Sequence, residues 1–195
     1  HEANYDDVDH VHFAPDDNLW GGRIALDRLL GADTLVYASL SRGYKSGGFN
    51  TDGSLDEDLR QFDPETLYNA EFGVKGSWHD DSLVGRFAVF YMRRDDMQVG
   101  TSLVRVRDDG SAEFIEYLGN ASKGSNYGAE AELRWLPTSR LEIFASLGIL
   151  ASEYDDFVNA AGVQLDGRQQ AQAPSYQAFS SIQYQFVGAW YVGVE

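Results

Sequence analysis

Three of the four histidines of this chain lie close together, among aspartates, near its first residue. The segment reads HEANYDDVDHVH and contains His1, His10 and His12. Imidazole and carboxylate groups together form a common ligand set for transition metals. The spacing matches no closed metal site, however, and acidic runs are more typical of solvated loops. We therefore expect an acidic loop, in which these three histidines are weak candidates for metal ligands.

Paired carboxylates recur along the chain and could act as general acid and base. The pairs are Asp16-Asp17, Asp80-Asp81, Asp95-Asp96, Asp108-Asp109 and Asp155-Asp156. Adjacent residues of a strand point to opposite faces of a sheet, so such a pair cannot share one substrate atom, and turns and loops account for the pairs better. The remaining histidine, His79, falls in a predicted turn, and no serine, histidine and acid combine into a catalytic triad. We expect neither an enzyme nor a cofactor.

The elements that carry these residues are predicted to be strands, because polar and apolar residues alternate along most of the chain. In NAEFGVKGSW, residues 69–78, every second side chain is small or apolar and the others are mostly polar. The predicted strands cover residues 21–30, 35–49, 65–78, 83–99, 114–136, 141–154, 174–186 and 190–195. The sequence therefore predicts an all-β chain.

The connections between these strands alternate in length. Tight turns are predicted at residues 31–34, 79–82, 137–140 and 187–189, and long polar loops at 50–64, 100–113 and 155–174. Short turns on one rim and long loops on the other are typical of an antiparallel up-and-down transmembrane β-barrel, with the long loops outside. Gly47 and Gly48 are expected to permit the bend where a strand enters the first long loop.

Composition agrees with a barrel wall and excludes one class of partner. The net charge of −16 would repel the phosphates of a nucleic acid. There is no cysteine, so neither disulfides nor thiolate metal sites stabilise the fold. No run of 18 apolar residues is present, and the mean hydropathy is −0.37; strands that cross a bilayer with only every second residue apolar are compatible with both values.

Four segments carry a specific family resemblance. LVYASLSRGYKSGGFN, FDPETLYNAEFGVKGSW, FAVFYMRRDDMQV and GNASKGSNYGAEAELRW follow one another between residues 35 and 135. Their order and spacing resemble the barrel of TonB-dependent outer-membrane receptors, and the similarity covers about residues 21–186. The resemblance implies about eight strands of a larger barrel, which has 22 strands in that family and is closed by an amino-terminal plug.

The same resemblance implies a function and a set of partners. Receptors of this family capture a scarce nutrient, most often a ferric siderophore, at the extracellular loops and import it with energy from the inner-membrane TonB complex, which acts through the plug. We therefore expect an outer-membrane protein of a Gram-negative bacterium, embedded in outer-membrane lipid. Residues 1–195 would form a partial barrel domain without a plug, and the chain beginning at His1 and ending at Glu195 would be part of a longer protein.

A barrel of this kind predicts which charged residues face its lumen. On the polar faces of the predicted strands, charged neighbours form ladders in which each side chain neutralises the next. The lumen-facing candidates are Arg42, Lys45, Glu71, Lys75, Glu130, Glu132 and Arg134. We expect most of these to stabilise the wall, and the functional alternative is that they dock the plug or line the path of the substrate.

Two other interpretations fit parts of the sequence. The eight predicted strands could close into a small complete outer-membrane barrel that acts as an enzyme or adhesin. Alternatively, strands rich in aromatic residues also occur in a soluble β-sandwich that serves as a binding module. The arrangement of the strands and the exposure of their two faces distinguish these alternatives from a piece of a large barrel.

Overall fold

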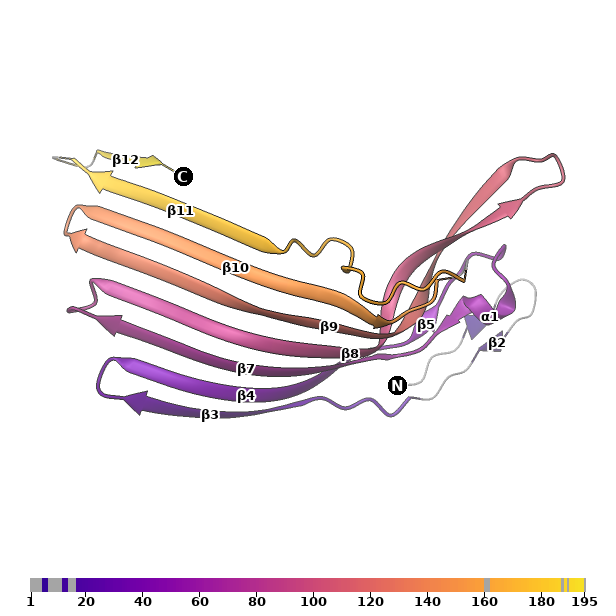
Figure 1. Ribbon diagram of the computed structural model, residues 1–195, viewed down its shortest axis with the longest axis horizontal. Helices are drawn as coiled ribbons and strands as arrows, with labels where there is room; N and C mark the ends of the chain where they lie inside the picture. The colour runs from indigo at the N-terminus through magenta and orange to yellow at the C-terminus, as the bar shows by residue number, and fades with distance from the viewer. Residues whose placement is uncertain are drawn as a thin grey trace.

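The computed structural model describes residues 5–6, 12–13, 17–159, 162–186, 188 and 190–194. Its main element is one antiparallel sheet of eight strands, and most neighbours in the sheet are also neighbours in the sequence (Figure 1). In order across the sheet, the strands are β3 (Gly22–Leu30), β4 (Thr34–Lys45), β7 (Glu65–Trp78), β8 (Leu83–Val106), β9 (Ala112–Thr138), β10 (Leu141–Asp156), β11 (Tyr176–Gln185) and β12 (Tyr191–Val194). The expectation of an all-β antiparallel chain is confirmed.

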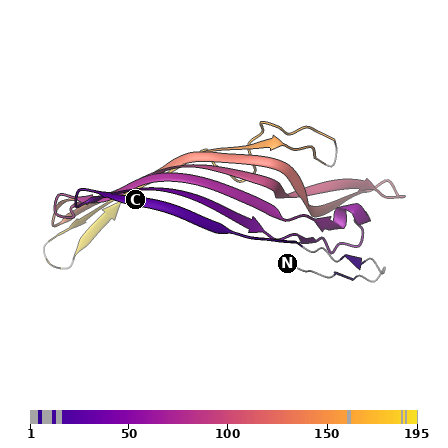
Figure 2. The same ribbon diagram turned by 90° about the horizontal axis from the view of Figure 1, so that it is seen from below.

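The sheet is a single curved layer with two open edges. Figure 2 shows the strands side by side along one arc, and no second layer of strands covers either face of it. Strands β3 and β12 lie at opposite edges, and in the described part of the chain they do not pair with each other. This arrangement is a segment of a barrel wall, and it fits neither a closed barrel of eight strands nor a β-sandwich.

One predicted loop is wrong. Residues 100–113 were expected to form a long polar loop, but β8 and β9 remain paired up to Val106 and Ala112. The alternation of β-branched and polar side chains in TSLVRV favours strand pairing. A tight turn closes the hairpin, in which Gly110 has a φ of 80° and Asp109 accepts hydrogen bonds from Ser111. The hairpin projects beyond the other strands (Figure 1).

The two remaining long connections contain little regular structure. The first includes β5 (Gly48–Phe49), β6 (Gln61–Phe62) and the short helix α1 (Glu57–Arg60), and the second, between β10 and β11, is irregular. Near the amino terminus, β1 (Tyr5–Asp6) pairs with β2 (His12–Phe13). No helix among the described residues is long and apolar enough to cross a membrane.

Glycine at positions 47 and 48 has a different role from the one expected. Neither residue has a positive φ, so the backbone bend does not require glycine. A Cβ atom on Gly47 would lie 2.7 Å from the carbonyl oxygen of Phe62, and one on Gly48 would lie 2.8 Å from the Phe62 ring. The two glycines therefore allow β5 to approach β6 closely.

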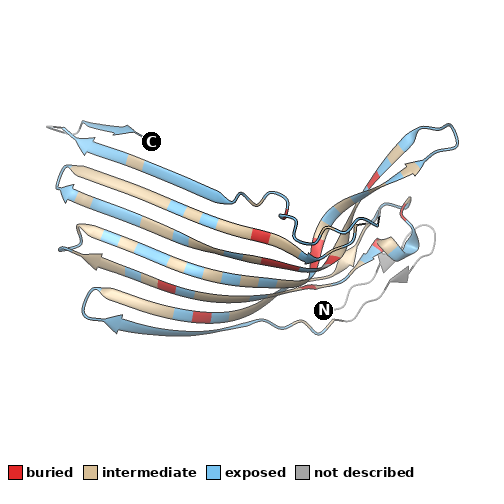
Figure 3. Ribbon diagram, in the orientation of Figure 1, coloured by how far each residue is buried: buried red, intermediate tan, exposed pale blue. Residues whose placement is uncertain are grey.

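Most of the buried residues lie at the end of the sheet where the long connections begin (Figure 3). Along the rest of the sheet, side chains on both faces are exposed or half-buried, because a single layer has no opposing layer to pack against. The buried apolar residues are Leu55, Met97, Ile115 and Ala121, and buried polar residues include Arg60, Glu65, Gln98 and Gln170. We call the segments that these residues join, residues 46–65, 94–126 and 152–170, the outer rim.

Candidate functional site

One face of the sheet is apolar from edge to edge. Cross-strand pairing places Ala38, Phe72, Val89, Ala129 and Ile149 in one row across five strands. The large side chains of this face are uncovered: Phe72 and Ile149 are both 50% exposed. A continuous exposed apolar surface of this extent requires either a partner or a membrane. We call it the apolar face.

Aromatic residues mark two edges of the apolar face. Tyr68 and Tyr127 lie toward the outer rim, whereas Trp78 and Trp135 lie near the short turns on the same two strands. At about 3.3 Å per residue, the strands rise about 26 to 33 Å between these positions. Strands tilted by about 35 to 45° would bring this to about 19 to 27 Å, a range that includes the apolar band of about 25 Å between the aromatic girdles of outer-membrane barrels.

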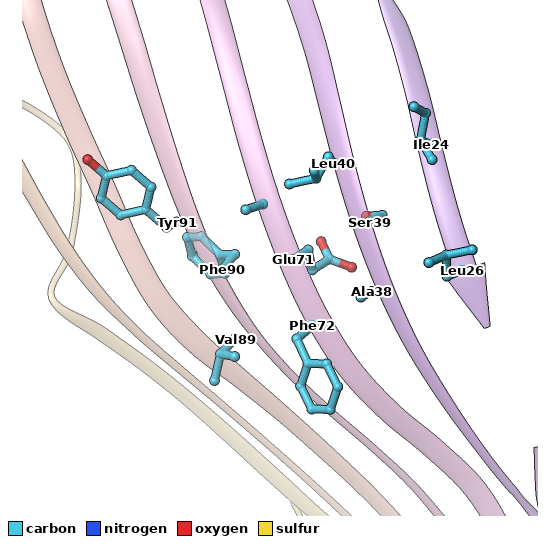
Figure 4. A pocket seen from close by; sticks show the side chains of 11 residues that line it. Ile24, Leu26, Ala38, Ser39, Leu40, Glu71, Phe72, Val89, Phe90 and Tyr91 are labelled. Atoms are coloured by element: carbon cyan, nitrogen blue, oxygen red, sulfur yellow. The ribbon is translucent and has the colours of Figure 1, made fainter. Parts of the chain in front are cut away.

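The apolar face contains a hollow of about 560 Å³ next to the β3 edge. Ile24, Leu26 and Leu40 border it on one side, and Phe72 and Tyr91 on the other (Figure 4). These side chains come from β3, β4, β7 and β8. The hollow can therefore hold an apolar group, and it is open to whatever covers the face.

The opposite face is polar and carries six of the seven charged candidates. Lys75, Arg86 and Glu132 lie in one row across β7, β8 and β9, and Arg86 forms an ion pair with Glu132. Nearer the short turns, Nε of Arg134 lies 2.9 Å from a carboxylate oxygen of Glu142. Cross-strand pairs of opposite charge therefore stabilise this face. We call it the polar face.

The remaining candidates extend the polar face toward the outer rim. Glu71 pairs with Ser39, Lys45 pairs with Glu65, and Glu130 lies opposite Gly148. The ammonium of Lys75 lies 5.2 Å from the centre of the Tyr37 ring, within the range of a cation–π contact. Which compartment this face meets stays a prediction.

Arg42 is the exception, and its predicted position is wrong. It pairs with Tyr68 and shares the apolar face with Ala38 and Leu40. Because side chains alternate along a strand, Arg42 cannot point to the same side as Lys45 or Glu71. Its guanidinium carbon lies 4.2 Å from the centre of the Trp20 ring and 5.6 Å from that of Tyr68. Two aromatic rings thus accommodate the cation on the apolar face.

A buried ion pair forms the centre of the outer rim. Glu65 is only 4% exposed, and its two carboxylate oxygens accept hydrogen bonds from Nε and Nη2 of Arg94 at 2.6 and 2.9 Å. The backbone N–H of Gln98 donates to the same carboxylate at 2.9 Å. Bidentate, charge-assisted pairs of this kind have a defined geometry. Glu65 therefore fixes the start of β7 against β8.

Gln170 joins the irregular connection after β10 to this network. Its Nε2 donates to Oδ1 of Asn126 and to the carbonyl oxygen of Glu153, both at 2.8 Å. Its Oε1 accepts a longer bond of 3.4 Å from Nη1 of Arg94. A Cβ atom at position 124 would lie 2.8 Å from Nε2 of Gln170, so Gly124 is needed for this approach. The loop is thereby held against the wall.

Two asparagines attach residues 46–64 to the long hairpin. Asn50 donates to the carbonyl oxygen of Leu118 and accepts from its N–H, both at 2.8 Å. Asn120 makes the equivalent pair of bonds with Asp63, at 3.0 and 2.8 Å. Each side-chain amide thus makes the two hydrogen bonds that the backbone of a paired strand would otherwise make. Together they make the first long connection a folded part of the rim.

Asp96 lies on β8 within the outer rim, with a φ of 53°. Its pKa is raised above the ordinary value, first by burial and then by the charges of Asp63 and Asp95. At the hairpin tip the effect is opposite, because hydrogen bonds from Ser111 lower the pKa of Asp109. No group of three or more potential ligands among the described side chains could hold a metal ion. His1 and His10 lie outside the described residues, and only the backbone of His12, in β2, is described.

The sequence did not identify the residues that hold the rim together. Glu65 begins a predicted strand directly after Pro64, but its partner Arg94 comes 29 positions later in another strand. The signals for Asn50, Asn120 and Gln170 are equally weak, because each is a single polar residue in or near a predicted loop. Only the three-dimensional pairing shows that they act together.

Comparison with known proteins gives the family. The family model "TonB dependent receptor-like, beta-barrel" matches residues 3–195. The pesticin receptor of Yersinia pestis is 30% identical over 114 residues, which are 58% of this chain and 15% of that protein.

Solved structures agree on the fold. The ferric yersiniabactin uptake receptor FyuA from Yersinia pestis matches 89% of this chain and 24% of its own, with a TM-score of 0.67 and 24% identity. The ferripyoverdine receptor of Pseudomonas aeruginosa matches 94% of this chain and 23% of its own, with a TM-score of 0.61 and 18% identity.

These shares show how much of a receptor the chain represents. The chain spans about a quarter of the solved receptors, and its match to the pesticin receptor covers 15% of that relative. The family comprises receptors and transporters rather than enzymes. Because the family model covers nearly the whole chain, the chain belongs to the TonB-dependent receptor β-barrel family.

Proposed function

We propose that this chain is part of the wall of an outer-membrane receptor that captures a ferric siderophore and imports it with TonB-coupled energy. The observation that carries the proposal is the two-faced sheet with a folded outer rim. Its apolar face is uncovered across the sheet, and its polar face is lined with ion pairs. Family membership links this architecture to import across the outer membrane of a Gram-negative bacterium.

The siderophore is supported by relatives. The similar structures include a ferric yersiniabactin uptake receptor and a ferripyoverdine receptor, although another is a copper transporter. We therefore assign a ferric siderophore as the ligand and the outer rim as the surface that first meets it. The buried rim network supports this role, because a preorganised surface loses less conformational freedom on binding.

The polar face is proposed to surround a plug domain located elsewhere in the full-length protein. Lys45, Glu71, Lys75, Glu130, Glu132 and Arg134 would line the lumen. Glu132 and Arg134 form ion pairs within this face, and the inner-membrane TonB complex would act through the plug. Arg42 is excluded from this group because it lies on the other face.

The import proposal is tested with radioactive iron. A strain that lacks the gene would receive the full-length gene or an empty vector, and uptake of a panel of ⁵⁵Fe-loaded siderophores would be measured under iron limitation. We expect the gene to restore uptake of at least one siderophore, and a protonophore to abolish that uptake. Restoration that persists with the protonophore would contradict energy coupling, and unchanged uptake of the whole panel would contradict the assigned ligand class.

Sidedness has a separate test. A protease added to intact cells is expected to cut within residues 155–174, where the connection is irregular, and to spare the turns at 79–82 and 137–140. Cleavage confined to those two turns would place the outer rim in the periplasm and would contradict the proposed orientation.

A further inference from the structure

We propose that Arg42 and the apolar hollow beside it form a binding site for one anionic lipid of the outer leaflet. The phosphate of the lipid would lie at Arg42, and an acyl chain would occupy the hollow. The proposal rests on the membrane placement of the apolar face given above and is independent of the imported ligand. It begins from Arg42, an arginine that lies on the apolar face close to the hollow.

Arg42 is held in place by neutral groups only. Its Nε donates to the hydroxyl of Tyr68 and its Nη2 to the hydroxyl of Thr66, both at 3.3 Å, and Nη1 donates to the carbonyl oxygen of Trp20. The Trp20 and Tyr68 rings contact the same guanidinium. Among the described residues no carboxylate pairs with Arg42. Its orientation is fixed while its positive charge is not neutralised.

Arg93 shows the contrasting case on the same face. It lies on β8 opposite Tyr68, in the same row as Arg42. Its Nε, however, lies 2.9 Å from a carboxylate oxygen of Asp95. The charge of Arg93 is therefore compensated within the protein, whereas no described carboxylate compensates Arg42, which is held in a fixed orientation next to the hollow. In a chain of net charge −16, an uncompensated cation among apolar residues indicates charge complementarity to a specific partner.

The hollow lies on the side of Arg42 away from the rim. Leu40 is two residues before Arg42 on β4 and borders the hollow together with Ile24 and Phe72 (Figure 4). The lining on this side is apolar, and the volume of about 560 Å³ is open to the bilayer. A phosphate with an acyl chain attached fits this order of groups: charge at the girdle and hydrocarbon below it. A free phosphate would contact only Arg42 and would leave the hollow unfilled.

The test is lipid retention by the full-length receptor. The protein would be purified in detergent containing equal amounts of phosphatidylglycerol and phosphatidylcholine, and the retained lipid would be counted by native mass spectrometry. One cation near a membrane surface contributes about a fivefold preference for an anionic lipid. We expect the wild type to retain phosphatidylglycerol preferentially and Arg42→Gln to reduce that preference about fivefold, with Arg42→Lys between them.

Arg28→Gln is the matched control. Arg28 lies on the apolar face of β3, fully exposed, but at the end near the short turns. This variant is expected to retain the lipid as the wild type does, and all variants should keep the wild-type melting temperature. Equal retention by Arg42→Gln and wild type would overturn the proposal. Displacement of the lipid by 10 mM inorganic phosphate, a concentration on the order of the dissociation constant of a weak anion site, would also overturn the proposal. The acyl chain would then contribute nothing to binding.

Discussion

The membrane-spanning part of the sheet and the outer rim are stabilised in different ways. In the spanning part, backbone pairing is regular from β3 to β11, and almost no side chain is buried. In the rim, the pairing of β9 with β10 shifts register between Tyr154 and Asp156, and buried polar side chains connect segments far apart in sequence. The first region needs an external apolar solvent, whereas the second forms its own small core.

The difference predicts that single polar substitutions should damage the rim more than equivalent changes elsewhere. The largest effect is expected for Glu65→Ala, which leaves the half-buried Arg94 guanidinium without its carboxylate partner. Removing one member of a buried pair costs about 3 to 5 kcal/mol. Hydrogen exchange in the full-length protein should show faster exchange at residues 94–98.

Glu113→Ala is the control for this change. Glu113 also pairs with an arginine, Arg107, at 2.9 Å, but the arginine side chain is 52% exposed at the hairpin tip. An exposed pair contributes less than about 1 kcal/mol. Similar losses for Glu65→Ala and Glu113→Ala would mean that burial of the ion pair does not determine its contribution to stability.

A smaller effect is expected for Asn50→Ala. The substitution removes three hydrogen bonds, to Leu59 and in both directions to Leu118, and leaves backbone groups unpaired. The expected loss is about 1 to 3 kcal/mol. Limited proteolysis of the full-length protein should then detect cleavage within residues 50–64, where the wild type resists. Asn50→Asp keeps the oxygen that accepts from the N–H of Leu118, and this variant should be cut at an intermediate rate. Equal resistance of the wild type and both variants would contradict the attachment of this loop by Asn50.

Gly124→Ala tests the attachment of the second loop. The added methyl group would lie 2.8 Å from Nε2 of Gln170 and 3.0 Å from Sδ of Met97. We expect a loss of about 1 to 3 kcal/mol from overpacking, seen as faster hydrogen exchange at residues 165–170. Gly148→Ala is the control, because a Cβ atom there has no neighbour within 4 Å. Equal exchange rates in the two variants would contradict close packing at Gly124.

The smallest effect concerns pH. Burial and the neighbouring Asp63 and Asp95 raise the pKa of Asp96, so the folded rim holds this proton more tightly than the unfolded chain does. Rim stability should therefore fall as pH rises from the unfolded pKa, about 3.9, through the raised folded value. Asp96→Asn should remove this fall. Hydrogen exchange between pH 4 and 7 measures it, and a wild-type rim that becomes more stable over this range would contradict the assignment.

The same contrast explains what could be predicted from the sequence. The strands were predictable because the alternation of polar and apolar residues is a local property of the sequence. In NAEFGVKGSW, the type of each residue indicates the face of the sheet on which its side chain lies. The rim was not, because Glu65 and Arg94, or Asn50 and Leu118, meet only after the strands have paired. The error at Arg42 has a physical reason as well. A charged residue was assigned to the polar face by its type, although alternation placed it with Leu40, and the Trp20 ring makes that position tolerable.

The central claim is that the apolar face meets lipid and the polar face meets the lumen. Leu147 and Gly148 are consecutive residues of β10 on opposite faces, and a side chain at Gly148 has open space opposite Glu130. In the full-length receptor, unfolding from lipid vesicles should show that Leu147→Arg costs about 2 to 4 kcal/mol near the midplane, and that Gly148→Arg costs about 1 kcal/mol or less. Equal costs, or a larger cost for Gly148→Arg, would contradict the assignment of the two faces.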